Sequence, residues 1–86
     1  MFYTYVLKNV KSGNLYTGST NDLRKRFKAH NSGKSAYTAK RGPYKLIYYE
    51  ACSNEGDART RERYLKTAMG KRYIQNRLKR FLSLMG

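Results

Sequence analysis

The first twenty residues contain two runs of β-forming residues separated by a turn. The first run, 2–7, is dense in aromatic and β-branched side chains, and a shorter run of the same kind occupies 15–18. Between them, residues 11–14 read Lys-Ser-Gly-Asn, a composition that favours turns. We therefore predict a β-hairpin at the start of a chain whose 86 residues are enough for one domain, 1–86, with a thin core.

Two helices and a third strand are predicted after the hairpin. A helix over 22–30, capped by Thr20 or Asn21, follows from the four-residue spacing of Leu23 and Phe27. Residues 31–43 are predicted to form a positively charged loop. Residues 44–49 are predicted to form a strand that is apolar or aromatic on both faces and ends at 51–53.

The remaining residues are predicted to be helical. Ser53 or Asn54 is expected to cap a second helix that ends at Gly70, and a third helix is expected from about Lys71. An apolar stripe should dock the third helix on the domain; its members are Ile74, Leu78, Phe81, Leu82 and Met85. The order hairpin, helix, strand, helix is typical of small α+β proteins.

The charge balance points to a polyanionic partner. The chain has 19 Lys and Arg against 5 Asp and Glu, a formal charge of +14, with a pI near 10.2. Nucleic acid is the first expectation, although ribosomal-type and membrane-surface proteins share this balance. No stretch approaches the roughly 20 apolar residues that span a bilayer, and the N-terminus lacks a signal-peptide pattern, so we expect a cytoplasmic protein without a membrane segment.

The scarcity of cysteine and histidine restricts the kinds of metal site. Cys52 is the only cysteine and His30 the only histidine, which excludes an intramolecular disulfide, a CxxC zinc pair and a histidine-rich site. A hard metal ion held by oxygen ligands remains possible.

Tyr5 and Tyr16 are the first candidates for chemistry. If the turn is centred on residues 12–13 so that Lys11 faces Asn14, both tyrosines project from the same face of the hairpin. A slip of one residue would separate them. Tyrosines are also good strand formers, so the pair alone does not establish a site.

Arg26 and His30 lie on or beside the apolar stripe of the first predicted helix, whereas Lys28 faces outward. The planar fork of an arginine suits a scissile phosphate, whose charge grows in the transition state. The alternatives are a side chain that extends past Phe27 to solvent and a structural histidine.

Glu62 is the third candidate, because its spacing from Ala58 and Leu65 places it on the inward face of the second predicted helix. One reading is an ion-pair network with Arg59, Arg61 or Arg63. The other is a magnesium ligand, because Mg²⁺ at phosphate chemistry commonly binds one or two carboxylates and keeps several waters.

Taken together, these residues resemble the GIY-YIG nuclease superfamily over about residues 2–67. Residues 3–5 (Tyr-Thr-Tyr) stand where that family has GIY, and residues 16–18 (Tyr-Thr-Gly) stand where it has YIG. Arg26, His30 and Glu62 follow at the family's spacing. The segments 36–38, 42–43 and 61–63 resemble those of the small single-domain members.

The sequence departs from the family pattern at three positions. Tyr3 replaces the glycine of GIY, and Thr4 and Thr17 replace the isoleucines, whereas both tyrosines and Gly18 are retained. The late asparagine of some members has no assigned counterpart. We expect the site to be intact, with close backbone approach as the reason for Gly18.

The resemblance implies a three-stranded antiparallel sheet flanked by helices, in the order ββαβα plus a C-terminal helix. It implies a metal-dependent endonuclease that hydrolyses DNA in repair or recombination, with Mg²⁺ or Mn²⁺ on Glu62. One tyrosine, preferably Tyr16, would activate the attacking water, which requires nearby cations because a phenol ordinarily has a pKa of about 10. Arg26 would stabilise the transition state, and His30 would orient a tyrosine or relay a proton.

Two alternatives to the enzyme remain. The first is a catalytically silent DNA- or RNA-binding module with the same fold and basic groove. The second is a basic protein whose partner is another protein. Glu62 discriminates between enzyme and binder, because a pure polyanion binder gains nothing from a carboxylate in its groove. A homodimer or a protein partner could supply substrate specificity.

Overall fold

The protein is built on a three-stranded antiparallel sheet. A computed structural model describes residues 1–32 and 43–84. Strand β1 (Phe2–Asn9) lies in the centre and pairs with β2 (Leu15–Thr20) on one side and β3 (Tyr44–Cys52) on the other. The predicted hairpin is therefore confirmed, whereas β3 continues past the break that we predicted at 51–53, because residues 2–4 of β1 provide pairing partners for residues 50–52.

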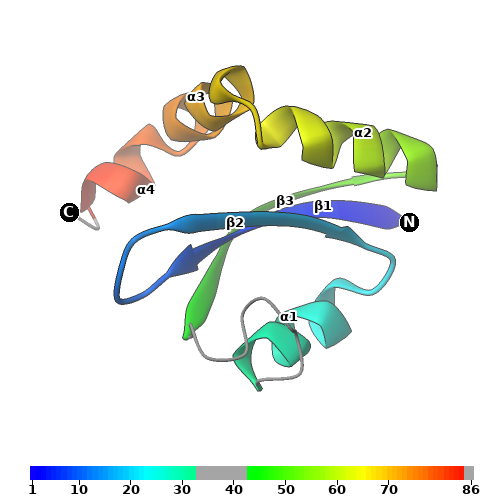
Figure 1. Ribbon diagram of the computed structural model, residues 1–86, viewed down its shortest axis with the longest axis horizontal. Helices are drawn as coiled ribbons and strands as arrows, with labels where there is room; N and C mark the ends of the chain where they lie inside the picture. Colours follow the sequence, from blue (N-terminus) through cyan, green and yellow to red (C-terminus); the bar gives the residue numbers. More distant parts are fainter. Residues whose placement is uncertain (33–42, 85–86) are drawn as a thin grey trace.

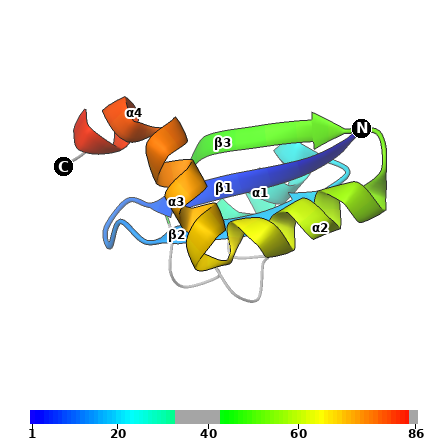
Figure 2. The same cartoon turned by 90° about the horizontal axis from the view of Figure 1, so that it is seen from above.

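Helices cover both faces of the sheet, which confirms the predicted α+β architecture. Figure 1 shows α1 (Leu23–Asn31) on one face, with α2 (Glu55–Leu65), α3 (Ala68–Arg77) and α4 (Lys79–Leu84) on the opposite side. In Figure 2, α2 runs roughly along the strands, whereas α3 turns away from it and crosses them. No helix in the described part of the chain is both long and apolar enough to cross a membrane.

The hairpin register differs from the predicted one by two residues. Lys8 faces Leu15 and Tyr5 faces Gly18, and the backbone N–H of Asn9 donates to Asn14 across the turn, whereas we predicted that Lys11 would face Asn14. The Asn9 side chain accepts hydrogen bonds from two turn N–H groups, which stabilises a longer loop. A two-residue shift leaves every side chain on its predicted face, because the side-chain period of a strand is two.

Alternation along β1 divides the core between the two faces. Tyr5 and Leu7 point toward α1 and form one buried cluster. Val6 points the other way and packs against Leu65 of α2 and Ile74 of α3. Both layers therefore depend on one central strand, as expected for a small domain with a thin core.

Acceptor side chains cap the N-termini of α1 and α2. Asp22 caps α1 and accepts from Lys25 N–H at 3.1 Å, so the prediction of Thr20 or Asn21 as cap was wrong. Thr20 instead accepts from Asp22 N–H and positions the true cap. Asn54 caps α2, as predicted, and accepts from Asp57 N–H at 3.1 Å.

The predicted end of α2 at Gly70 was wrong. Helix α2 ends at Leu65, and Thr67 begins α3 by accepting a hydrogen bond from Gly70 N–H at 3.1 Å. A Cβ at Gly70 would lie 2.0 Å from the Tyr64 carbonyl oxygen, so this glycine allows the two helices to meet closely. Gly70 therefore marks a close helix–helix contact. In the sequence, a glycine at such a contact looks the same as a glycine that ends a helix.

The C-terminal residues form two helices where one was predicted from Lys71. Helix α3 begins at Ala68 and ends at Arg77, and α4 follows. Ile74 is buried, whereas Leu78 and Phe81 are half-buried, so the predicted stripe weakens toward the C-terminus. Its last member, Met85, lies outside the described residues, as does most of the predicted loop at 31–43.

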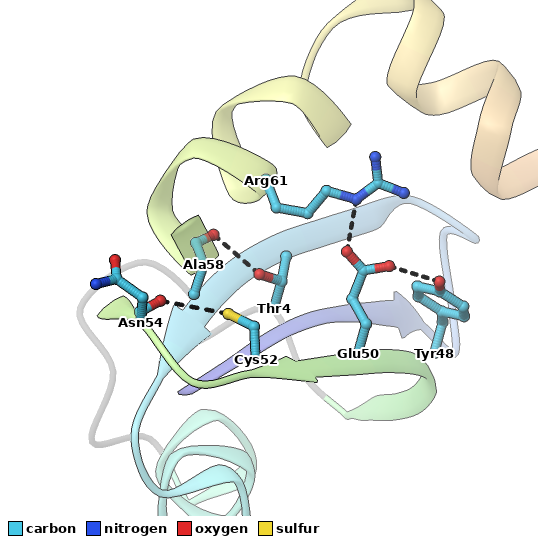
Figure 3. A network of polar contacts seen from close by, with 7 residues as sticks. All are labelled: Thr4, Tyr48, Glu50, Cys52, Asn54, Ala58 and Arg61. Carbon is cyan, nitrogen blue, oxygen red and sulfur yellow. Dashed lines mark hydrogen bonds and ion pairs between the residues drawn. The ribbon is translucent and has the colours of Figure 1, made fainter. Parts of the chain in front are cut away.

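A polar network fastens α2 to β3 and β1 (Figure 3). Glu50 accepts from Arg61 Nε at 2.5 Å and from the Tyr48 hydroxyl at 2.7 Å. Thr4, which is only 2% exposed, donates its hydroxyl to the Ala58 carbonyl at 2.9 Å. A buried hydroxyl without a partner would be costly, so these bonds also fix where α2 lies on the sheet.

Candidate active site

Tyr5 and His30 form the buried centre of the site. Tyr5 Oη lies 2.8 Å from His30 Nε2, and each residue is only 1% exposed. Burial raises the pKa of Tyr5, although a hydrogen bond from Arg26 acts in the opposite direction. Burial and the charge of Arg26 lower the pKa of His30. At neutral pH the phenol therefore keeps its proton and the imidazole is neutral, and Tyr5 Oη and His30 Nε2 share one hydrogen bond.

Gly18 makes room for the Tyr5 ring. A Cβ at Gly18 would lie 2.5 Å from Tyr5 Oη and 2.7 Å from Tyr5 Cζ, distances at which one group must move. The ring of Tyr5 thus crosses over β2 at its directly opposite residue. The expected close approach at Gly18 is present, and its partner within the chain is the phenol of Tyr5.

Tyr16 lies on the same face as Tyr5, as predicted. Its ring is 4.9 Å from the His30 ring, centroid to centroid, in an edge arrangement at 63°. Tyr16 is half-buried, whereas Tyr5 is almost fully enclosed. Tyr16 is therefore the more solvent-accessible of the two tyrosines.

Arg26 lies on α1 one turn before His30 and is half-buried. Hydrogen bonding to Tyr5, together with the nearby phenol of Tyr16, raises the pKa of the guanidinium above its ordinary value. Arg26 is therefore a permanent cation beside both tyrosines. Lys28, predicted to face outward, is exposed.

Glu62 approaches β2 from the opposite face of the sheet. The Ser19 hydroxyl donates to Glu62 Oε1 at 2.6 Å, and Lys66 Nζ lies 2.8 Å from Glu62 Oε2. Burial alone would raise the pKa of this carboxyl, but hydrogen bonds from Lys66 and Ser19 hold the pKa below its usual value. Glu62 is therefore ionised at neutral pH.

An ion-pair network with neighbouring arginines was one of the two readings left open for Glu62, and the ion pair that Glu62 forms in the structure is with Lys66. Arg59 pairs with Glu55 at 3.3 Å, and Arg61 pairs with Glu50. Helical geometry explains the difference, because residues four apart share a face whereas Arg61 and Arg63 diverge from Glu62 by about 100°.

A single carboxylate fits only one kind of metal site. Within residues 1–32 and 43–84, no three His, Cys, Asp or Glu side chains cluster closely enough to hold a metal. Glu62 is ionised, and its side chain is 22% exposed. It therefore suits a cation that keeps several waters and takes further oxygens from a phosphate, which is the habit of Mg²⁺.

Sequence reasoning missed the two direct partners of Glu62. Ser19 lies on the face of β2 opposite Gly18, and strand alternation with the YIG-like motif as reference would have placed it toward α2. Lys66 follows Glu62 by four residues, a spacing at which oppositely charged side chains pair on a helix. Both signals were present in the sequence.

Comparisons with known proteins agree with this geometry. The model of the GIY-YIG catalytic domain matches residues 1–79. The chain is similar to the UPF0213 protein CPE1444 of Clostridium perfringens, with 54% identity over 67 residues, or 77% of this chain and 71% of that protein. It is also similar to the UPF0213 protein YazA of Bacillus subtilis, with 42% identity over 79 residues, or 87% and 80%.

A solved structure shows the same fold. The solution NMR structure of the UPF0213 protein BH0048 from Bacillus halodurans has a TM-score of 0.55 and 35% sequence identity, and the match covers 88% of this chain and 84% of that one. GIY-YIG catalytic domains are nuclease-type domains that act on nucleic acid and generally depend on a divalent metal. Because the family match spans 79 of 86 residues and includes both tyrosine motifs, Arg26, His30 and Glu62, the chain belongs to the GIY-YIG family.

Proposed function

We propose that this chain is an endonuclease that hydrolyses DNA phosphodiester bonds with the aid of Mg²⁺ or Mn²⁺. One observation carries the proposal: strand β2 has the cluster of Tyr5, Tyr16, Arg26 and His30 on one face and an ionised carboxylate, Glu62, on the other. This arrangement supplies cationic and proton-transferring groups on one side of an edge strand and a metal ligand on the other.

The two tyrosines have different roles in the proposal. Tyr5 is enclosed, has a raised pKa and is hydrogen-bonded to His30, so it fixes the orientation of the imidazole and keeps its own proton. Tyr16 is more exposed and packs its ring against His30. Tyr16 is therefore the residue that would contact the attacking water beside the positive charge of Arg26. To accept the water's proton, Tyr16 must first release its own phenolic proton to solvent and react as the phenolate.

Arg26 acts on the phosphate. Its guanidinium is a permanent cation, and its donors can meet two phosphate oxygens at once. Negative charge on the non-bridging oxygens increases in the transition state, so a fixed cation at that point lowers the barrier.

Glu62 holds the metal in the proposal, and a bound Mg²⁺ would neutralise charge on the leaving oxygen. Ser19 orients the carboxylate through Oε1 at 2.6 Å. Lys66 lies on Oε2, but its side chain is 54% exposed and can move to a neighbouring phosphate. Ser19 and Lys66 together keep the Glu62 carboxylate ionised before substrate binds, and the Lys66 ammonium balances its negative charge.

The same Lys66–Glu62 pair favours the alternative of a silent binding module. A carboxylate already satisfied by an ammonium and a hydroxyl can serve a purely structural role. In that case Glu62 would stabilise α2 against β2 and the basic surface would bind nucleic acid without cleaving it.

Glu62→Gln separates these functions. The amide keeps the size and helix propensity of the side chain but removes the charge that attracts a metal, so cleavage of labelled DNA in Mg²⁺ should fall about 100-fold or more. DNA affinity in chelator should be retained or increase. The melting temperature should change little, because a pair with one partner mostly exposed contributes no more than about 1 kcal/mol.

The matched control is Glu55→Gln. Glu55 lies on the same helix and forms an i,i+4 pair with Arg59, but that pair is largely exposed, and the Ser19 hydroxyl donates to Glu62. This variant should cleave like the parent. Full cleavage by Glu62→Gln with a lowered melting temperature would contradict the metal assignment, and no cleavage by the parent on single-stranded, branched or duplex DNA would favour the silent module.

A further inference from the structure

A pocket of about 420 Å³ lies beside the proposed active site, between the start of β2 and the junction of α2 with α3. Its volume is within the roughly 300–1,000 Å³ that is common for small-molecule sites. Its apolar lining comes from Leu15, Val6, Leu65 and Ile74. The last three are core residues, so the floor is rigid, whereas Leu15 is 36% exposed at the mouth.

The pocket adjoins the proposed reaction centre. Tyr16 lines it from β2, and Lys66, whose ammonium lies 2.8 Å from Glu62, lines it from the end of α2. Lys71 of α3 is the second cation among its lining residues and is exposed. A ligand in this pocket would therefore have an apolar contact surface with two ammonium groups close by.

We infer that this pocket binds one unstacked nucleobase of the substrate, with the phosphates next to that nucleotide on Lys66 and Lys71. An apolar floor accepts the faces of a base without requiring a particular sequence, and ammonium groups suit the adjacent phosphates. The inference rests on the proposed function for its position, because it places the base beside the scissile phosphate.

Several observations favour a nucleotide over an apolar peptide as the occupant. The chain carries +14, and the polar end groups of the side chains that line the pocket on this face are the ammonium groups of Lys66 and Lys71 and the hydroxyl of Thr17. A polyanion with flat apolar bases matches both features, whereas a hydrophobic helix would leave the lysines unmatched. In duplex DNA the base would first have to leave the stack, so the pocket should favour DNA in which one nucleotide is already unstacked.

The test is a base-deletion scan read by binding in chelator. Single-stranded oligonucleotides with one abasic position each are titrated against the full chain, and a 2-aminopurine probe reports stacking at the sensitive position. We expect one position at which loss of the base weakens binding roughly tenfold. Leu15→Asp should abolish that sensitivity, because a carboxylate at the mouth repels the nucleotide.

Leu84→Asp is the matched control, because it adds the same charge at a leucine that is 88% exposed on α4 and does not line the pocket. It should keep the position-specific sensitivity. Leu15→Ala, which adds no charge, should reduce the sensitivity in part, and melting curves verify that each variant is folded. Lys71→Gln should lower the slope of log affinity against log salt by about one.

The outcomes separate this inference from the proposed function. Equal affinity for every abasic oligonucleotide, or identical behaviour of Leu15→Asp and Leu84→Asp, would overturn the pocket assignment even if the parent cleaves DNA. A sensitive position that disappears in Leu15→Asp would support it even if the parent cleaves nothing, because binding in chelator requires no catalysis.

Discussion

Gly18→Ala, a change on the strand next to Tyr5, should disrupt the hydrogen bond between Tyr5 and His30. The added Cβ would meet Tyr5 Oη at 2.5 Å, and ordinary contact begins near 3.4 Å, so the hydroxyl must move by about 0.9 Å. Tyr5 is 1% exposed and its hydroxyl bonds to His30 at 2.8 Å, so it has little free space. A shift of this size lengthens the bond beyond hydrogen-bond range.

The loss of folding free energy in Gly18→Ala has two contributions. Overpacking in a core costs about 1–3 kcal/mol, and the lost hydrogen bond adds about 0.5–1.5 kcal/mol. Their sum is centred on about 3 kcal/mol, a loss that lowers the melting temperature of a domain of this size by roughly 12–24 °C. Cleavage should fall about 100-fold, since a misplacement near 1 Å in a catalytic group has that effect.

A double-mutant cycle isolates the contact. In a Tyr5→Leu background the ring is absent, so Gly18→Ala should be neutral or stabilise by about 0.5–1 kcal/mol, because alanine is less flexible than glycine within a strand. Calorimetry of the four proteins gives the coupling energy. Equal destabilisation in both backgrounds, or a Gly18→Ala protein that melts and cleaves like the parent, would refute the proposed packing of Tyr5 over β2.

Three further predictions concern charge. DNA affinity should fall linearly with salt on a log–log plot, with a slope of about −0.7 to −0.9 per phosphate contact; a flat response would exclude a basic binding surface. Arg26→Lys should lose most cleavage, whereas Lys28→Ala should retain it; equal activity would show that Arg26 only extends to solvent. Because the folded-state pKa of His30 is lowered, the unfolded chain takes up the proton first, so stability should be complete above about pH 6.5 and decline below it. Urea unfolding at pH 7.5 and 5.5 measures this decline, which should disappear in His30→Gln.

The face on which each hairpin side chain lies was predictable, although the register was not. Alternation alone placed Tyr5 and Tyr16 together, and the structure pairs Tyr5 with Gly18, two residues from the predicted partner. The reason is the Asn9 side chain, which stabilises a longer turn than the sequence between the strands suggested. A register error of two residues leaves each side chain on its predicted face, because side chains alternate with a period of two. The same error changes which residue lies directly opposite on the neighbouring strand.

Tertiary contacts account for what the sequence could not show. Gly70 has the local signature of a helix end, but its role is to admit the Tyr64 carbonyl at a helix–helix junction. The buried Thr4 replaces an apolar family position because its hydroxyl reaches the Ala58 carbonyl 54 residues away. Neither contact leaves a periodic pattern in the chain, so only the folded arrangement reveals it.

In the proposed mechanism, the composition of β2 explains how so small a domain can present two kinds of chemical group to one phosphate. Tyr16 and Gly18 face α1, where Gly18 admits the Tyr5 ring, and Ser19 faces α2, where it holds Glu62. Because β2 is an edge strand, the groups on its two faces lie next to a free strand edge, where the proposed mechanism requires one phosphate to reach both. In this mechanism, the alternation of side chains along β2 keeps the proton-transfer groups on one face and the carboxylate on the other. Inserting one residue in β2 would exchange these faces, so it should abolish cleavage even in a variant that remains folded.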